Sequence, residues 1–157
     1  MKFAILHLSD IHIKNTENHV FDKVNEIINS IKNKLFDEKF LFIVTTGDIA
    51  NTGNNQEYNE AINFYKKLEE ELAIYLKDLS IKFIFSPGNH DCDFSISNDI
   101  RELVLEKINK DDFEIDNIKK DYISNCVSVQ ENYFNFKSEL EDKSAIYEPL
   151  NSSLFTR

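Results

Sequence analysis

Three short apolar runs, each followed by side chains that can bind a metal or transfer a proton, constrain this chain most. The runs are residues 3–8, 40–44 and 81–85, and each has the length of one β-strand. The polar residues that follow the runs in order are Asp10 and His12, then Asp48, then Asn89, His90 and Asp91. Parallel strands end at one edge of a sheet, so the pattern predicts that these side chains lie together.

Helical patterns separate the predicted strands. Apolar residues recur at helical spacing in residues 20–35, 61–75 and 100–108. The resulting β-α-β-α-β-α order implies parallel strands joined by right-handed crossovers, with helices on the faces of the sheet. The second run is short and continuously apolar, which is typical of a strand covered on both faces.

Length and composition indicate a globular protein. The 157 residues are 41% hydrophobic and include 13 Phe, so they can bury a sizeable core. No apolar run approaches the roughly 18 residues of a membrane span, and the N-terminus lacks the apolar segment of a signal peptide, so we expect a cytoplasmic protein. Cys92 and Cys126 have no paired-motif spacing and are expected to be reduced thiols, although Cys92 is near enough to His90 to line a site.

The net charge disfavours a general nucleic-acid binder. The chain has 18 basic and 28 acidic residues, a net charge of −10, and no basic stripe. Nucleic acid is therefore a disfavoured partner but is not excluded. Phosphate chemistry is compatible with the acidity, because bound divalent metals supply positive charge locally.

Four of the residues that follow the three runs suit a metal site. Asp10 and His12 can reach the same ion, and a carboxylate with an imidazole suits Zn²⁺, Fe or Mn²⁺ better than Ca²⁺. Asp48 follows Gly47, whose backbone freedom lets the chain approach a ligand closely, and is placed to bridge two ions. Asn89 can offer its amide oxygen to the second ion.

His90 and Asp91 indicate proton transfer beside these metals. Two ions about 3.5–4 Å apart lower the pKa of a bridging water and hold the oxygens of a phosphoryl displacement. A protonated His90 could then assist the leaving oxygen, with Asp91 orienting its imidazole. Of the other histidines, His7 lies within the first run and is expected to be packed in the core, whereas His19 is expected on the surface at a helix start.

Three stretches resemble the first three signature blocks of the calcineurin-like metallophosphoesterases: LHLSDIH at 6–12, TGDIAN at 46–51 and PGNHD at 87–91. The resemblance covers residues 1–100 and implies an α/β fold, the N-terminal half of a four-layer α/β-β/α sandwich with a mostly parallel sheet flanked by helices. It also implies a dinuclear metal site that hydrolyses phosphate esters. By position, the implied roles are first-metal ligands Asp10 and His12, bridging ligand Asp48, second-metal ligand Asn89, catalytic His90 and its support Asp91.

The sequence departs from the family pattern after the third block. The family continues with a Gly-His block and a Gly-His-x-His block that complete both coordination shells, whereas no histidine follows His90 here. We therefore expect an N-terminal portion of a longer protein, with an incomplete site and low activity, rather than a degenerate enzyme. Residues 1–109 would be the βαβαβα half, and residues 110–157 either an acidic, helical insertion or the start of the missing second half.

A half-sandwich leaves one face or edge of its sheet uncovered, so self-association is a further expectation. Within residues 110–157, the acidic segment 111–116 indicates a linker or weak strand, residues 129–140 carry one more helical pattern, and residues 147–157 show neither pattern.

Three functions remain open from the sequence. The favoured one is a metal-dependent phosphoesterase acting on a phosphomonoester or phosphodiester such as a nucleotide. A nuclease of the double-strand-break-repair type shares the same blocks but would favour a basic groove. A non-catalytic binding or regulatory module could use segment 111–116 or the helix near Tyr133. Such a module has no need of the five residues Asp10, His12, Asp48, Asn89 and His90.

Overall fold

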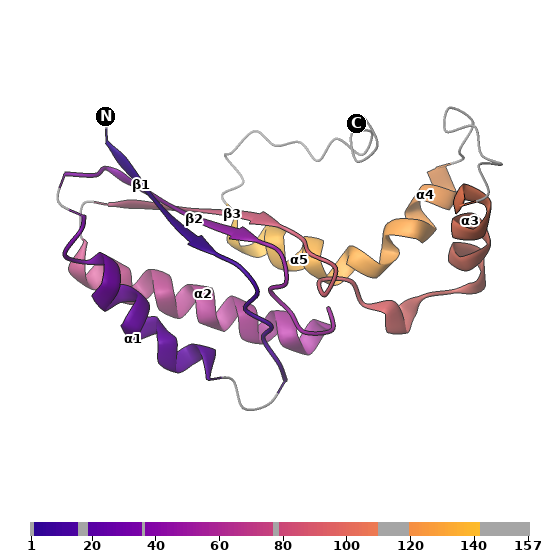
Figure 1. Cartoon of the computed structure of the whole chain (residues 1–157), viewed down its shortest axis with the longest axis horizontal. Coiled ribbons are helices and arrows are strands. Elements are labelled where there is room, and N and C mark those ends of the chain that lie inside the picture. Colours follow the sequence, from indigo (N-terminus) through magenta and orange to yellow (C-terminus); the bar gives the residue numbers. More distant parts are fainter. Residues whose placement is uncertain (1, 16–18, 36, 77–78, 110–119, 142–157) are drawn as a thin grey trace.

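A parallel sheet with helices on one face forms the described part of the chain (Figure 1). The computed structural model describes residues 2–15, 19–35, 37–76, 79–109 and 120–141. The strands lie in the order β1-β2-β3 and all run parallel, as predicted, with bounds β1 Phe3–Leu8, β2 Phe40–Thr46 and β3 Ser80–Ser86. Helix α1 (Val20–Ile31) follows β1, and helix α2 (Asn55–Tyr75) follows β2.

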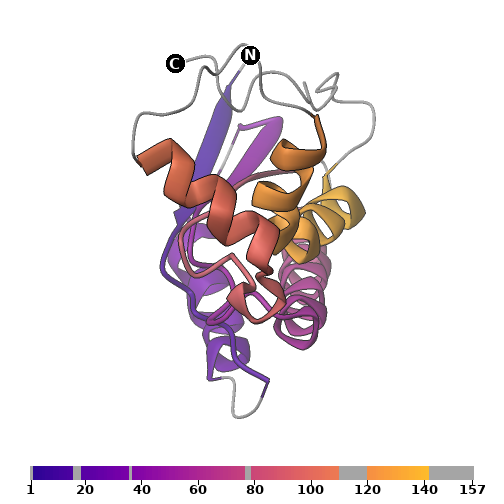
Figure 2. The ribbon, with the colours of Figure 1, turned by 90° about the vertical axis from the view of Figure 1, so that its right-hand side faces the viewer.

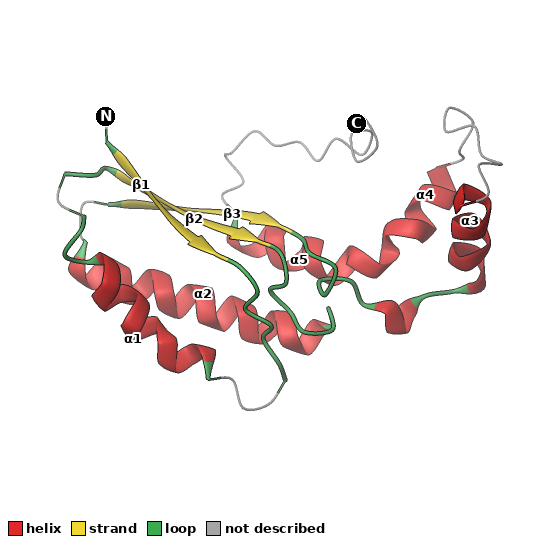
Figure 3. Cartoon of the chain, viewed as in Figure 1, coloured by secondary structure: helices red, strands yellow, loops and turns green. Residues whose placement is uncertain are grey.

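The chain after β3 forms shorter helical elements, which Figure 3 shows in red. They are η1 (Phe94–Ile96), α3 (Asp99–Asn109), α4 (Lys120–Val127), η3 (Ser128–Gln130) and α5 (Glu131–Leu140). The patterns at 100–108 and 129–140 correspond to α3 and to η3 with α5, whereas α4 was not predicted. Helices α3 and α4 lie beyond the carboxyl ends of the strands (Figures 1 and 2). The predicted features at 111–116 and 147–157 lie outside the described residues.

The hydrophobic core lies between one face of the sheet and helices α1, α2 and α5. Alternate strand residues such as Ile43 and Phe83 point into it. Tyr65 of α2 is fully buried at its centre, where its ring packs edge-on against Phe85 with the centroids 5.0 Å apart and its hydroxyl lies 2.8 Å from Thr45 Oγ1. Helix α5 contributes buried side chains to the same core, so residues before and after position 109 share one core. The predicted boundary between a unit 1–109 and a unit 110–157 stays a prediction.

The opposite face of the sheet carries no helix within the described residues. Its side chains include Phe3, Ile5 and Ile84, which are 57%, 61% and 46% exposed, and the half-buried Phe40 and Phe42. The expectation that both faces of β2 are covered is therefore wrong for this part of the chain, because α1, α2 and α5 all pack on the same face. One uncovered face is what a half-sandwich predicts.

The outer edge of β3 is occupied by side chains from the end of α5. The backbone N–H of Phe85 donates to Glu141 Oε1 at 3.0 Å, and Lys137 Nζ donates to the Phe85 carbonyl at 3.4 Å. Lys137 and Glu141 also pair with each other at 3.6 Å. These contacts satisfy polar groups of an edge strand that could otherwise pair with another strand.

Two histidines lie away from the predicted site. His7 is exposed on the uncovered face, where its Nε2 lies 2.7 Å from Thr46 Oγ1, so the prediction of a packed core histidine is wrong. The reason is the strand period, which points positions 3, 5 and 7 away from the helices. His19 is exposed at the start of α1, as predicted, and Cys92 and Cys126 are both free. No helix among the described residues is long and apolar enough to cross a membrane.

Candidate metal centre

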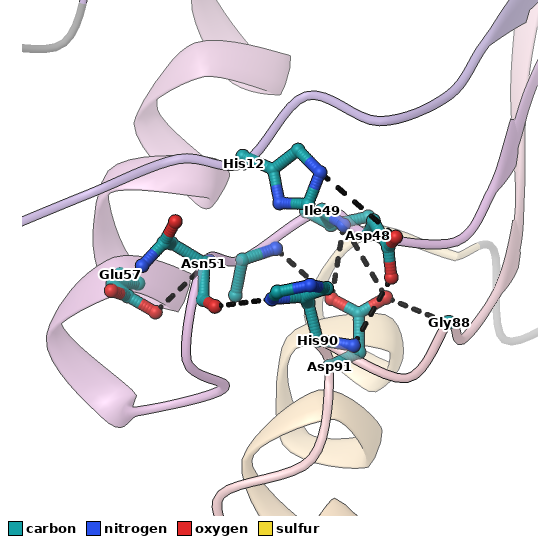
Figure 4. A network of polar contacts seen from close by, with 9 residues as sticks. His12, Asp48, Ile49, Asn51, Glu57, Gly88, His90 and Asp91 are labelled. Carbon is teal, nitrogen blue, oxygen red and sulfur yellow. Dashed lines mark hydrogen bonds and ion pairs between the residues drawn. The ribbon is translucent and has the colours of Figure 1, made fainter.

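The three polar segments lie together beyond the carboxyl ends of the strands, where Figure 4 shows them at close range. The segment after β1 is hydrogen-bonded to the segment after β2. The backbone N–H of His12 donates to the Asp48 carbonyl at 2.9 Å, and that of Ile13 donates to the Ile49 carbonyl at 2.8 Å. Asn51 N–H returns a bond to the Ile13 carbonyl at 3.0 Å. The parallel pairing of β1 and β2 thus continues into the site.

Three of the predicted site residues have left-handed backbone conformations. The φ angles of Asp10, His12 and Asp48 are 54°, 50° and 54°, and these are the non-glycine residues with positive φ in the described chain. Such a conformation costs an L-residue roughly 1–2 kcal/mol. Backbone strain of this kind clusters at functional sites, so its restriction to predicted ligands supports a site at this edge.

Two glycines bring the segments after β2 and β3 into backbone contact. A Cβ atom on Gly47 would lie 2.9 Å from the Cα of Gly88, and one on Gly88 would collide with the Asp48 carboxylate. The His90 N–H also donates to Asp48 Oδ1 at 3.1 Å. The glycines are therefore required here for close approach rather than for flexibility.

His12, Asp48 and His90 form a group whose metal-binding atoms all lie within 4.8 Å of one another. The His12 and His90 rings meet edge-on with centroids 4.7 Å apart, and His12 Nε2 lies 3.9 Å from Asp48 Oδ2. Two imidazoles and a carboxylate are a donor set that fits Zn²⁺, Fe or Mn²⁺.

Asp10 and Asn89 lie in the same segments, are exposed, and stand outside the group of three. Their predicted roles as ligands stay predictions. His90, which the sequence assigned to proton transfer, lies among the candidate ligands.

The hydrogen bonds of the Asp91 carboxylate go to groups other than the His90 imidazole, and its predicted role of orienting that ring stays a prediction. Asp91 is fully buried and accepts hydrogen bonds from the backbone N–H groups of Ile49, Ala50 and Gly88 at 3.0, 2.9 and 2.8 Å. It also accepts from the Tyr58 hydroxyl at 3.0 Å. A buried carboxylate requires such donors, so Asp91 joins the segments after β2 and β3.

The ring of His90 is oriented by a backbone carbonyl. Its Nδ1 lies 2.8 Å from the Asn51 oxygen. A carbonyl oxygen only accepts hydrogen bonds, so Nδ1 carries the hydrogen and Nε2 is the nitrogen left for a metal or a substrate.

Glu57, a residue of α2 that the sequence analysis did not single out, supports this arrangement. Its carboxylate is 3% exposed and accepts from Thr52 N–H at 2.7 Å and from Asn51 N–H at 3.1 Å. The available signal was the capping pattern Asn54-x-x-Glu57. Asn54 does cap α2, accepting from Glu57 N–H at 3.0 Å, but that pattern predicts a helix start and says nothing of the site.

Comparison with known proteins places the chain in a family. The family model described as calcineurin-like phosphoesterase matches residues 3–152. The chain is also similar to a protein named Uncharacterized protein R555 from Acanthamoeba polyphaga mimivirus, with 32% identity over 102 residues that cover 60% of this chain. The aligned region spans 7% of that relative's length. With the match across most of its length and the convergence of His12, Asp48 and His90, the chain belongs to the calcineurin-like phosphoesterase family.

Proposed function

We propose that this chain forms part of a metal-dependent phosphoesterase site that uses water to hydrolyse a phosphate ester. The observation that carries the proposal is the convergence of His12, Asp48 and His90 at the carboxyl edge of the sheet in a member of this family. The complete site would hold two divalent ions, with Mn²⁺, Fe or Zn²⁺ favoured by the donor set. When bound, such ions polarise phosphoryl oxygens and make a bound water more acidic.

The chain's own residues have separate roles in this proposal. His12 and Asp48 would hold metal, with Asp48 as the ligand common to both ions. Asp10 and Asn89 would add exposed oxygen donors for the first and the second ion. His90 donates from Nδ1 to the Asn51 carbonyl, so the protonated ring would present its second hydrogen, on Nε2, to the leaving oxygen.

We also propose that the site is incomplete in this chain. The later Gly-His and Gly-His-x-His blocks that complete both coordination shells in the family pattern have no counterpart here, because no histidine follows His90 in the sequence. Weak metal binding and slow turnover are the expected consequences. A version of the protein that also carries the later histidine blocks should hydrolyse phosphate esters with Mn²⁺ far faster, and equal activity in the two forms would contradict incompleteness.

Metal analysis with a Mn²⁺ titration tests the site directly. Wild type should bind Mn²⁺ weakly or bind a single ion, and Asp48→Asn should abolish that binding. Asp22→Asn is a matched control, because Asp22 is an exposed carboxylate on α1. Tight binding of two ions by wild type would refute incompleteness, whereas unchanged binding in Asp48→Asn would refute the site.

The substrate is proposed to be a small phosphate ester, with nucleotides included. The net charge of −10 favours such a substrate over DNA, whose backbone an acidic surface repels. Mn²⁺-dependent hydrolysis of a small phosphodiester and of DNA ends, compared in a version that carries the later histidine blocks, separates this proposal from a nuclease. If Asp48→Asn left the biological activity of that version intact, a non-catalytic binding module would be favoured over both.

A further inference from the structure

A buried carboxylate is linked to His90 through a single peptide group. The peptide between Asn51 and Thr52 is hydrogen-bonded at both of its polar ends. Its carbonyl accepts from His90 Nδ1 at 2.8 Å, and its N–H, which belongs to Thr52, donates to Glu57 Oε2 at 2.7 Å. Figure 4 shows Asn51 lying between Glu57 and His90.

We propose that Glu57 is a positioning residue that fixes the tautomer and orientation of His90 through this peptide. The carboxylate, the 51–52 peptide and the imidazole form a relay in which each hydrogen bond polarises the next. A negative charge beside the peptide N–H makes the peptide oxygen a stronger acceptor, and that oxygen requires the hydrogen to be on Nδ1. Nε2 is thereby the nitrogen left to take up and deliver a proton in the site. This inference deepens the proposed function and rests on it for its catalytic significance.

The contacts of Glu57 differ from those of an ordinary helix cap. In a capping box, the glutamate at the third helical position reaches back to the N–H of the capping residue, which here is Asn54. The Glu57 carboxylate instead reaches past Asn54 to the N–H groups of Asn51 and Thr52, and both of these bonds end on Oε2. The remaining contacts of the carboxylate come from the Thr52 hydroxyl, at 3.1 and 3.2 Å. Its charge is therefore directed at the loop that holds the His90 ring.

Side-chain nitrogen NMR measures the tautomer without metal or turnover. Two-bond ¹H–¹⁵N spectra of the metal-free chain at about pH 9 report neutral imidazoles, because histidine ordinarily titrates near pH 6.5. The His90 signals are identified by their loss in His90→Gln. Wild type should show the hydrogen on Nδ1. Glu57→Ala leaves Thr52 N–H without its acceptor, so the 51–52 peptide is no longer held against His90. Losing the His90 bond as a consequence, at an ordinary net strength of about 1.4 kcal/mol, should shift the ratio of tautomers about tenfold toward Nε2–H.

Two further variants separate the relay from a structural role of Glu57. Glu57→Gln keeps an oxygen that can accept both backbone bonds, so the hydrogen should stay on Nδ1, while the loss of charge moves the Nδ1 resonance upfield. Asn54→Ala removes the helix cap, a loss of the kind that costs about 1 kcal/mol of stability, but leaves the bond from Thr52 N–H to Glu57. It should therefore leave the His90 spectrum unchanged.

Several results would overturn the relay. They are a wild-type His90 with its hydrogen on Nε2, a Glu57→Ala spectrum that matches wild type, or an equal shift in Asn54→Ala. If Glu57→Ala does not fold, Glu57→Gln decides, and an unshifted Nδ1 resonance in that variant refutes polarisation by the carboxylate. Because the spectra require no metal, failure of the relay is distinguishable from failure of the phosphoesterase proposal, which the Mn²⁺ titration reports.

Discussion

Replacing Asp91 by Asn should weaken the connection between the segments after β2 and β3. Its Oδ1 accepts from the N–H groups of Ile49 and Ala50 and from the Tyr58 hydroxyl, while Oδ2 accepts from Gly88 N–H at 2.8 Å. The residue is fully buried, so water does not replace a lost partner freely. Asparagine has almost the same shape but only one acceptor oxygen.

The magnitude follows from the contact that asparagine cannot make. With its oxygen in the place of Oδ1, its NH₂ group faces the N–H of Gly88, donor against donor. A hydrogen bond to a charged group contributes about 1.5–3 kcal/mol, so Asp91→Asn should lower the free energy of unfolding by about 2–3 kcal/mol. Asp91→Ala leaves all of these donors without an acceptor and should lower the free energy of unfolding further, by on the order of 4–5 kcal/mol. A loss of that size is comparable with the whole stability of a small domain, about 5–15 kcal/mol.

Tyr58→Phe removes one donor of the same cluster and should cost about 1 kcal/mol. Burial and the charge of Asp91 raise the pKa of the Tyr58 hydroxyl above its usual range, so the hydroxyl stays protonated and donates at neutral pH. The expected order of destabilisation is therefore Asp91→Ala, then Asp91→Asn, then Tyr58→Phe.

Urea unfolding followed by far-UV circular dichroism, in buffer with a chelator, measures these losses. Without urea, amide hydrogen exchange at Gly88 should be faster in Asp91→Asn than in wild type, while the exchange rates of the strand amides stay the same. Asp10→Asn is the matched control, because Asp10 is an exposed carboxylate of the same site and asparagine tolerates its φ of 54°. The reasoning is refuted if Asp91→Asn unfolds within about 0.5 kcal/mol of wild type, the range of ordinary surface substitutions, or if Asp10→Asn costs as much.

Two further predictions concern alkaline pH and self-association. Burial raises the pKa values of Tyr58, Tyr65 and Tyr133 in the folded chain, so the unfolded chain loses these protons first as the pH rises. The free energy of unfolding should therefore be unaffected below about pH 10 and should fall above it by about 1.4 kcal/mol per pH unit for each tyrosine. Urea unfolding from pH 9 to 11 measures this slope. Tyr133→Phe should reduce the slope by about one third without loss of stability at pH 7, since the Tyr133 hydroxyl is buried without a partner among the described residues. An unchanged slope in Tyr133→Phe would contradict the contribution of this tyrosine. We also propose that a second copy of the chain covers the open sheet face, so sedimentation should show concentration-dependent association that Ile5→Lys reduces and Ile74→Lys on α2 does not, both side chains being 61% exposed. A monomer over a wide concentration range would contradict that proposal.

The parts of this fold that the sequence predicts are those that depend on apolar periodicity and on residue type. Strand runs and helical spacing predicted the order of strands and α-helices through α3. The polar residues at the strand ends predicted that side chains gather at the carboxyl edge of the sheet, where His12, Asp48 and His90 lie together. His12, Asp48 and His90 come from one edge of the sheet because parallel pairing brings the three strand ends together. That step requires only the direction of the strands.

The contacts that hold the site in shape were not predictable in the same way. The partners of Asp91 and Glu57 are mostly backbone N–H groups, which every residue but proline carries and which no side-chain pattern reveals. The position of His7 required knowing which face of the sheet the helices cover, and a continuous apolar run such as β2 does not distinguish one covered face from two. Helix α4 was missed because its short sequence has no buried residue to mark a periodicity.

The strained backbone of the candidate ligands depends on the hydrogen bonds around it, including those of the buried Asp91 carboxylate. Asp10, His12 and Asp48 each hold a backbone conformation that costs roughly 1–2 kcal/mol, a cost that persists only where the surroundings enforce it. The enforcing contacts are the backbone bonds between the segments after β1 and β2 and the bonds that Asp91 makes between the segments after β2 and β3. These contacts all run between residues of the chain itself, so they should help to hold the candidate ligands near one another. Loosening Asp91 should therefore weaken Mn²⁺ binding even though its carboxylate lies outside the group of candidate ligands.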